Sequence, residues 1–217
     1  MVDFLQARQN MIDGQLRPNR VTDPRLLAAI AELPREQFLP ASLRGVAYID
    51  DDIPLGNGRY LIEPMVLCRL VQAAGVKPTD KVLDIACATG YSTALLARLA
   101  GQVTALESDA GLAQQAQGHL QAQGIANAKI VIGHLADGCP AEAPYDAIVI
   151  GGAVQQVPAA VQGQLAEGGR LVAVFANGNA GTARLMQMIG GAVSSRPLFD
   201  AGTPGLPGFE RSAQFVF

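Results

Sequence analysis

The stretch KVLDIACATG, residues 81–90, indicates the fold class of this chain. Its first half is an apolar run, its second half is a short turn, and residues 91–100 continue with the composition of a buried helix. A strand, a tight turn and a helix N-terminus together present backbone N–H groups and a positive dipole end to a ligand. Nucleotide-binding turns usually carry several glycines, and here only Gly90 remains.

Strand-like and helix-like segments alternate from this turn onward. Helix-like residues 91–100 and 109–123 separate the first three of five segments rich in Val, Ile and Leu. The alternation predicts βαβ units and therefore a three-layer α/β fold, a mostly parallel sheet with helices on both faces. Its ligand is expected at the carboxyl ends of the strands, at the switch point beside the first strand. The five strand-like segments are residues 82–86, 103–107, 129–132, 147–150 and 170–175.

The segment before residue 81 has a different pattern. Residues 23–33 and 63–74 are predicted to be helices, and residues 50–58 between them are predicted to be a turn-rich loop. We therefore expect residues 1–80 to form an N-terminal helical cap on the substrate side of the sheet.

After residue 175 the sequence predicts two further strands, residues 182–189 and 212–217. A Gly/Pro-rich loop, residues 201–208, would join them and extend the sheet. Residues 184–189 fit a helical period equally well. With either alternative, residues 81–217 form the sheet and its C-terminal strands, and the whole chain, 1–217, is expected to be a single domain.

The composition is that of a globular protein. The 217 residues are 49% hydrophobic and 16% charged, which is enough apolar surface for one large core. A net charge of -3 without a basic patch argues against a nucleic-acid partner. We see no targeting segment and no apolar run of membrane-spanning length, so we expect a cytoplasmic protein without a membrane partner. Three widely spaced cysteines without a CxxC motif predict neither disulfides nor a metal site.

Asp84 and Glu107 are the strongest polar candidates for ligand binding. Glu107 ends a predicted strand 23 residues after Asp84, close to the interval of about 20 residues at which an acid binds a ribose in nucleotide sites. The alternative is that both acids simply cap the helices that follow. A pyrophosphate ligand is disfavoured, because the Cβ atoms of Ala86 and Ala88 obstruct close backbone approach. A ligand without phosphates, such as S-adenosylmethionine, is less demanding.

Several segments of the chain match the motifs of one known family: MIDGQLR (11–17), DPRLLAA (23–29), PREQFLP (34–40), AYID (47–50) with Pro54, Gly56 and Gly58, residues 81–91 and 103–107, PYDAI (144–148) and LAEGGRL (165–171). Through these segments the chain resembles the protein-L-isoaspartate O-methyltransferase family nearly end to end. The resemblance implies a Rossmann-like methyltransferase fold and the cofactor S-adenosyl-L-methionine. It also implies methyl transfer to the α-carboxyl group of L-isoaspartyl residues in damaged proteins, so that isoaspartyl peptides or proteins are the partners.

Site residues follow from the same resemblance. Leu61, Ile62, Glu63 and Pro64 would line the methyl-transfer site, with no residue assigned as catalytic. The residues that would hold the cofactor are Asp84, Ala86, Ala88, Gly90, Tyr91, Glu107, His134 and Leu135.

Three departures from the family pattern fall at this site. The family reads Gly-x-Gly-Gln-Thr-Ile-Ser-x-Pro where this chain has residues 56–64, so that Ile62 replaces a serine and its hydroxyl. Ala86 and Ala88 replace glycines of the first sheet motif. His134 stands where the family has an acid that meets the adenine amino group; neutral imidazole could accept that hydrogen bond, or His134 could be an exposed loop residue.

Three functions therefore stay open at this point. The first is isoaspartyl methylation. The second, motivated by Ile62, is methyl transfer to another small molecule or peptide group. The third is a binding or regulatory protein that has kept the fold and lost catalysis. Glu63 is either an ordinary charge at a helix start or a replacement for the lost polar group, and Cys87 is expected to be a buried thiol rather than a nucleophile.

Overall fold

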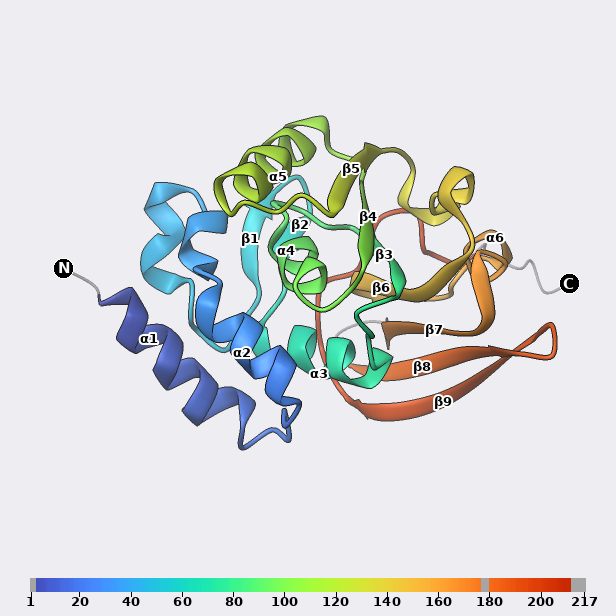
Figure 1. The fold of residues 1–217 in the computed structure, drawn as a ribbon, viewed down its shortest axis with the longest axis horizontal. Coiled ribbons are helices and arrows are strands. Elements are labelled where there is room, and N and C mark those ends of the chain that lie inside the picture. The colour runs from blue at the N-terminus through green and yellow to red at the C-terminus, as the bar shows by residue number, and fades with distance from the viewer. Residues whose placement is uncertain (1–2, 177–179, 212–217) are drawn as a thin grey trace, which may run out of the picture.

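A seven-stranded sheet forms the centre of the computed structural model, which describes residues 3–176 and 180–211 (Figure 1). The strand order is β5-β4-β3-β6-β7-β8-β9. Strands β3 to β7 run parallel to one another, β8 runs antiparallel to β7, and β9 runs antiparallel to β8. The order reverses beside β3, so the switch point lies where the sequence predicts it. The strands are β3 (Lys81–Ile85), β4 (Gln102–Glu107), β5 (Ala128–Ile132), β6 (Tyr145–Val154), β7 (Leu165–Ala176), β8 (Gly181–Ile189) and β9 (Ala192–Asp200).

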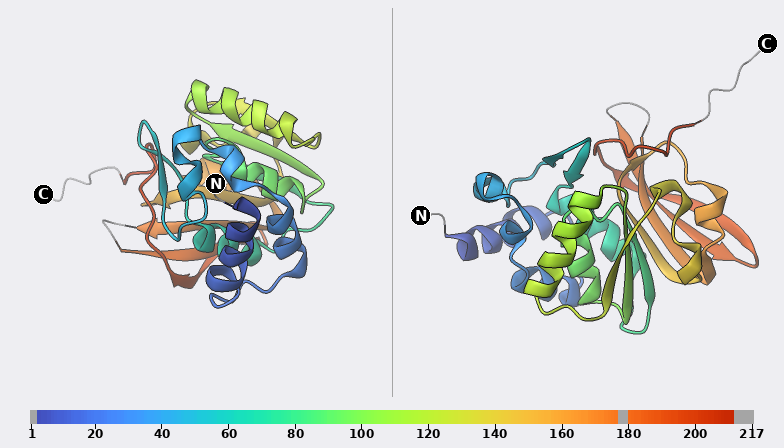
Figure 2. Two further views of the ribbon diagram at one scale, coloured as in Figure 1. Left: turned by 90° about the vertical axis from the view of Figure 1, so that its left-hand side faces the viewer. Right: turned by 90° about the horizontal axis from the view of Figure 1, so that it is seen from above.

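Helices cover both faces of this sheet, as predicted (Figure 2). The two helices expected in the N-terminal region are present: the Asp23 side chain accepts the N–H of Arg25 at the start of α2, and Glu63 precedes α3. The α-helices are α1 (Phe4–Met11), α2 (Pro24–Glu32), α3 (Pro64–Ala74), α4 (Tyr91–Ala97), α5 (Ala110–Ala122) and α6 (Ala159–Gln162). A π-helical segment, η1 (Ile12–Leu16), follows α1, and the 3-10 helical segments are η2 (Arg35–Phe38), η3 (Ala41–Val46), η4 (Leu135–Asp137) and η5 (Pro140–Glu142).

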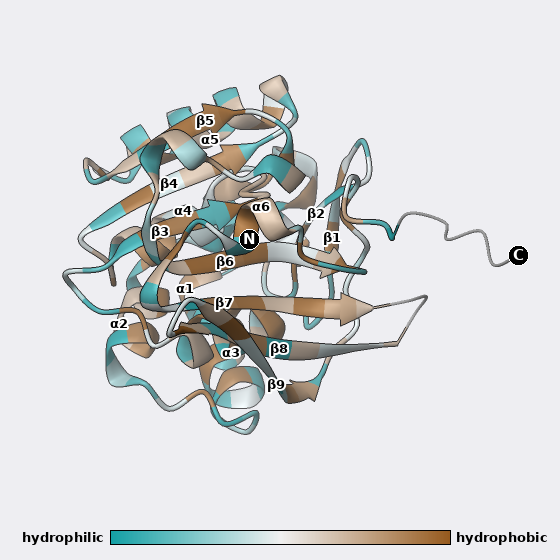
Figure 3. Ribbon diagram, turned by 90° about the vertical axis from the view of Figure 1, so that its right-hand side faces the viewer, coloured by the Kyte–Doolittle hydropathy of each residue, from teal (hydrophilic) through white to brown (hydrophobic). Residues whose placement is uncertain are grey.

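Alternate residues of each central strand enter different cores. Val82 of β3 belongs to the largest hydrophobic cluster, which joins one face of the sheet to α2, α3 and α4. Leu83 belongs to a second cluster on the other face, which includes α6 and two residues of the C-terminal segment, Leu206 and Phe209. Figure 3 shows hydrophobic residues concentrated along β3, β6 and β7, while α5 carries many hydrophilic ones. The N-terminal elements thus pack directly on the sheet.

Residues 53–61 form a hairpin, whereas the sequence predicts a turn-rich loop over residues 50–58. Its strands are β1 (Ile53–Gly56) and β2 (Arg59–Leu61), and they pair antiparallel to each other outside the main sheet. Asn57 and Gly58 at the turn have φ angles of 51° and 68°. An Asn-Gly pair between short apolar runs is a strong signal for a two-residue hairpin turn, so this hairpin was predictable from the sequence.

The C-terminal part of the sheet also differs from the prediction. Residues 184–189 are extended in β8, so the helical alternative is wrong. Gly190 and Gly191, both with positive φ, turn the chain directly into β9, which the sequence analysis missed. The strand predicted at residues 212–217 lies outside the described residues. Residues 184–189 pair with β7 on one side and β9 on the other, and this pairing outweighs the helical period of the short segment.

None of the helices in the described part of the chain combines the length and the apolar character needed to cross a membrane.

Candidate active site

The turn between β3 and α4 keeps a glycine-type backbone although it contains alanines. Ala86, Ala88 and Gly90 have φ angles of 69°, 51° and 92°. Left-handed backbone costs an alanine roughly 1–2 kcal/mol, so this conformation is held by its surroundings. At Gly90 a Cβ atom would lie 3.1 Å from the Cβ of Ala116, so a side chain here would be crowded as well as conformationally strained.

Asp84 lies fully buried at the end of β3. Its Oδ2 atom accepts hydrogen bonds from the hydroxyls of Ser92 (2.7 Å) and Thr93 (2.6 Å), both on α4. Its Oδ1 atom has no hydrogen-bond partner among the described residues. Burial raises the pKa of Asp84 to about 6, and the Glu107 charge adds to this effect. One carboxyl oxygen is therefore left over for a donor that the described chain does not supply.

Glu107 lies at the end of β4, next to the same turn. The N–H of Ala88 donates to Glu107 Oε2 at 2.7 Å, and the N–H groups of Ser108 and Asp109 donate to Oε1 at 2.8 and 3.1 Å. The structure thus brings together the two acids that the sequence singles out, on adjacent parallel strands. Neither side chain caps the helix after its strand: Gly90 precedes α4 without a side-chain cap, and Asp109 caps α5.

Arg59 is a site residue that the sequence analysis missed. Its Nη2 and Nε atoms donate to Glu107 Oε2 and Oε1 at 2.8 and 3.2 Å, and both side chains are buried. Burial alone would raise the pKa of Glu107, but the hydrogen bonds and charge of Arg59, together with the backbone N–H groups, hold it below its ordinary value. Glu107 is therefore ionised at neutral pH.

The hairpin that carries Arg59 also contacts the start of α5. Asn57 Nδ2 donates to Asp109 Oδ2 at 2.9 Å, while Asp109 Oδ1 accepts the N–H of Leu112. The β1–β2 hairpin therefore lies across the carboxyl end of β4, at the edge where a ribose is expected to bind.

The residues predicted to line the methyl-transfer site are mostly buried. Leu61 and Ile62 belong to the largest hydrophobic cluster, and the Ile62 carbonyl accepts a hydrogen bond from Arg35 Nη2 at 2.7 Å. Pro64, also buried, begins α3. Glu63 is half-buried, and burial together with the charges of the neighbouring aspartates raises its pKa to about 7. The Glu63 carboxyl group is therefore protonated more easily than a fully solvated one at a helix start.

Three other predicted residues lie apart from the turn's polar groups. The Tyr91 ring packs 5.4 Å from that of Phe38 and has the Arg35 guanidinium 4.8 Å from its centroid, so it belongs to the core. Leu135 is buried in the second cluster. His134 is exposed, immediately before η4. Of these three residues, only His134 is exposed.

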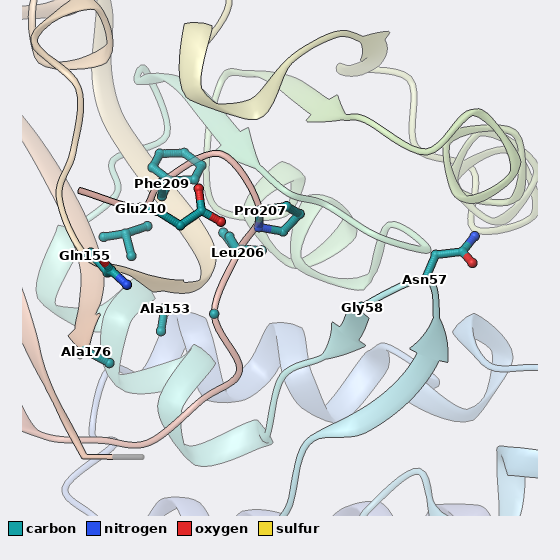
Figure 4. A pocket seen from close by; sticks show the side chains of 11 residues that line it. Asn57, Gly58, Ala153, Gln155, Ala176, Leu206, Pro207, Phe209 and Glu210 are labelled. Carbon is teal, nitrogen blue, oxygen red and sulfur yellow. The ribbon is translucent and has the colours of Figure 1, made fainter. Parts of the chain in front are cut away.

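A cavity of about 420 Å³ lies beside the hairpin tip (Figure 4). Asn57 and Gly58 line one side, and the C-terminal segment, residues 205–210, lines the other. This segment pairs with the end of β6, since the N–H of Leu206 donates to the Ala153 carbonyl at 2.8 Å. The lining residues include none of those predicted to hold the cofactor. The cavity therefore lies between the hairpin tip and the C-terminal segment, whereas Ala86 and Ala88 of the β3–α4 turn are buried.

The family model for "Protein-L-isoaspartate(D-aspartate) O-methyltransferase (PCMT)" matches residues 6–196. The chain belongs to this family. Among similar family members, the protein-L-isoaspartate O-methyltransferase of Koribacter versatilis is 40% identical over 172 residues, which are 79% of this chain and 78% of that protein. The corresponding protein of Methanoculleus marisnigri is 37% identical over 168 residues, 77% and 76% of the two chains.

Solved structures agree with this family assignment at the level of the fold. A protein-L-isoaspartate O-methyltransferase structure has a TM-score of 0.79 at 24% identity, covering 93% of this chain and 66% of its own. A PCMT structure from Plasmodium falciparum, in complex with S-adenosyl-L-homocysteine, has a TM-score of 0.78 at 18% identity, covering 95% and 99%. The Rossmann-like methyltransferase fold implied by the sequence is confirmed.

Proposed function

We propose that this protein transfers a methyl group from S-adenosyl-L-methionine to the carboxylate of L-isoaspartyl residues in damaged proteins. Membership of the family carries the proposal, because its similar members are named for this activity. The geometry adds support: the β3–α4 turn keeps three left-handed residues, and Asp84 and Glu107 flank it. Isoaspartyl peptides or proteins would be the acceptors.

The turn offers groups that fit this cofactor. Asp84 Oδ1 is a buried acceptor without a partner among the described residues, and it suits a cationic donor such as an amino group. The N-terminus of α4 and the left-handed backbone of residues 86–90 supply N–H groups. Ala86 and Ala88 would line the turn, Glu107 would face the ribose, and His134 and Leu135 would lie on the adenine side. Glu107 can accept hydrogen bonds from the ribose hydroxyls only after the Arg59 side chain has moved away from it.

The chain would act mainly by positioning. The cofactor supplies an electrophilic methyl group on a sulfonium whose departure needs no proton. The acceptor carboxylate is already ionised at pH 7, so no general base is required. Leu61, Ile62 and Pro64 make an apolar wall, and Arg35 holds the backbone of Ile62 in place. Such a wall excludes water and orients the reactants, which supplies most of the rate in a reaction of this kind.

A methyl-transfer assay tests this function. Two synthetic peptides of one sequence, one with L-isoaspartate and one with L-aspartate, would be incubated with methyl-labelled S-adenosylmethionine. We expect base-labile label in the isoaspartyl peptide only. Equal label in both peptides would favour a different acceptor, as the loss of the family serine at Ile62 suggests. No label at cofactor concentrations that saturate the protein would defeat the repair assignment.

The proposal extends to organisation and location. We propose that residues 1–217 act as one methyltransferase unit, in which residues 1–80 cover the substrate side and residues 81–217 hold the cofactor. The packing of the N-terminal helices on the sheet supports this division. We also propose a cytoplasmic location, with which the three free, buried cysteines agree.

A further inference from the structure

We propose that Arg59 occupies the ribose subsite, so that a nucleoside binds only after the Arg59 side chain has left Glu107. The inference rests on the proposed function, since it concerns the same cofactor site. The Arg59–Glu107 contact would then determine how tightly the site binds its nucleoside.

The acceptor capacity of Glu107 carries the first step. A carboxylate has about four lone-pair sites. Glu107 receives two hydrogen bonds from Arg59, three from the backbone N–H groups of Ala88, Ser108 and Asp109, and one from the Ser108 hydroxyl at 3.3 Å. The backbone groups belong to the turns that build the site. Arg59 is therefore the partner that a pair of ribose hydroxyls would have to replace.

Burial carries the second step. The side chains of Arg59 and Glu107 are 3% and 0% exposed, so solvent does not separate them. A ligand that takes the place of Arg59 exchanges a charge-assisted bidentate pair for neutral hydroxyl donors. Binding then carries the free-energy cost of breaking the pair, and the observed affinity falls by the fraction of molecules in which Glu107 is free.

The attachment of the hairpin shows how Arg59 could move. The β1–β2 pair forms its own two-stranded sheet and shares no strand ladder with the main sheet. Its base is anchored by the buried side chains of Ile53 and Leu61, whereas its tip is joined to the sheet side through Asn57–Asp109 and Arg59–Glu107. The Asp109 carboxylate, whose pKa is lowered first by Asn57 and in part by the Arg59 charge, offers a nearby surface partner for the displaced guanidinium.

Calorimetry with S-adenosyl-L-homocysteine tests the proposal. Arg59→Gln removes the charge and shortens the side chain, and Arg17→Gln is the matched control, since Arg17 forms an exposed ion pair with Asp13. We expect the Arg59→Gln variant to bind at least tenfold more tightly than wild type, and the control to bind as wild type does. Equal or weaker binding by Arg59→Gln overturns the inference.

Nitrogen-15 NMR of the arginine side chains tests the same step in the wild-type protein and does not depend on the variant folding. The Nε–H of Arg59, bonded to Glu107, and that of Arg35, bonded to the Ala47 carbonyl at 2.8 Å, should both exchange slowly with solvent. Saturation with S-adenosyl-L-homocysteine should expose the Arg59 signal to exchange and leave that of Arg35 protected. Continued protection of Arg59 in the saturated protein overturns the inference.

The outcomes separate this inference from the proposed function. Tighter binding by Arg59→Gln without methyl transfer to an isoaspartyl peptide supports the inference and defeats the repair assignment. Methyl transfer to an isoaspartyl peptide, with Arg59→Gln binding S-adenosyl-L-homocysteine as wild type does, supports the repair assignment and overturns the inference about Arg59. If neither wild type nor Arg59→Gln binds S-adenosyl-L-homocysteine at millimolar concentration, Arg59 is not the group that closes the site. The inference about Arg59 and the repair assignment are then both overturned.

Discussion

Arg59 Nη2 lies 2.8 Å from Glu107 Oε2, inside the protein and 48 positions away along the chain. The contact joins the N-terminal cap to the carboxyl end of β4. It neutralises an acid that would otherwise be buried alone, and it places a guanidinium at the edge of the sheet where ligands of this fold bind. We therefore expect this ion pair to influence both the stability of the protein and the access of a ligand to Glu107.

Removing the cation should destabilise the fold strongly. We expect Arg59→Ala to lower the free energy of unfolding by about 3–5 kcal/mol, because it leaves the Glu107 carboxylate buried without a counterion. Urea denaturation at pH 7 measures this difference. Arg17→Ala, which breaks the exposed pair with Asp13, should change the value by at most about 1 kcal/mol. Similar losses in the two variants would contradict a dominant role for burial.

The ion pair also predicts a pH dependence. The pKa of Glu107 is lower in the folded protein than in the unfolded chain, so its ionisation stabilises the fold above the unfolded pKa of roughly 4.3. Wild type should therefore exceed Glu107→Gln in unfolding free energy at pH 6 to 8. This advantage should disappear as the pH falls below about 4 and through the folded pKa. An advantage that grows on acidification would show that the carboxylate is not stabilised.

Asp84 should show the opposite dependence. Its folded pKa is raised to about 6, so the folded state binds the proton more tightly than the unfolded chain does. Wild type should lose stability relative to Asp84→Asn as the pH rises from about 4 to about 6, by roughly 3 kcal/mol at 1.36 kcal/mol per pKa unit. Urea denaturation across this range measures the change. A difference independent of pH would mean that Asp84 does not titrate there.

The alanines of the turn make distinct predictions. Ala88→Gly should stabilise the protein by about 0.5–1 kcal/mol, because relief of left-handed strain exceeds the added freedom of the unfolded chain. Ala86→Gly should be near neutral, because the Ala86 methyl packs in the second hydrophobic cluster and its removal costs roughly 0.8 kcal/mol. The Ala88 methyl is equally buried but belongs to none of the hydrophobic clusters of the described residues, so its removal should cost less. Thermal or urea unfolding compares them with Ala28→Gly on the exposed side of α2, which should lose about 1 kcal/mol. If Ala88→Gly loses as much as Ala28→Gly, the turn is not strained.

The contact between β6 and the C-terminal segment can be tested by a double-mutant cycle. A Cβ atom on Gly152 would lie 2.6 Å from Leu206 Cγ, so Gly152→Ala should cost about 1–3 kcal/mol through overpacking. In a Leu206→Ala background most of this cost should vanish, because the clashing atoms are absent. Urea denaturation of the four proteins gives the coupling energy. Additive losses would show that the segment does not pack there in solution.

Local patterns in the chain were sufficient for the parallel strands and for both acids of the site. Strand and helix periods are properties of neighbouring residues. Asp84 interrupts an apolar run near its end, and Glu107 ends another. The hairpin at Asn57-Gly58 was also readable from a local turn signal, although the prediction missed it. The β8–β9 hairpin at Gly190-Gly191 carries the same kind of local signal and was also missed. The pairing of β8 with β7 could not be predicted locally, because strand pairing depends on the neighbour that a segment meets as well as on its own sequence.

The amino-acid sequence alone therefore identified the α/β fold, its ligand-binding edge and the family, since these depend on periodicity and on short motifs. It did not reveal that Arg59 faces Glu107, because a contact across 48 residues depends on how the hairpin packs on the sheet. It could also not show that Ala86 and Ala88 adopt a glycine-type backbone, because side-chain identity only disfavours that conformation, while the surrounding packing imposes it. The partner of Glu107 and the backbone conformation of the β3–α4 turn thus depend on contacts between residues far apart in the sequence.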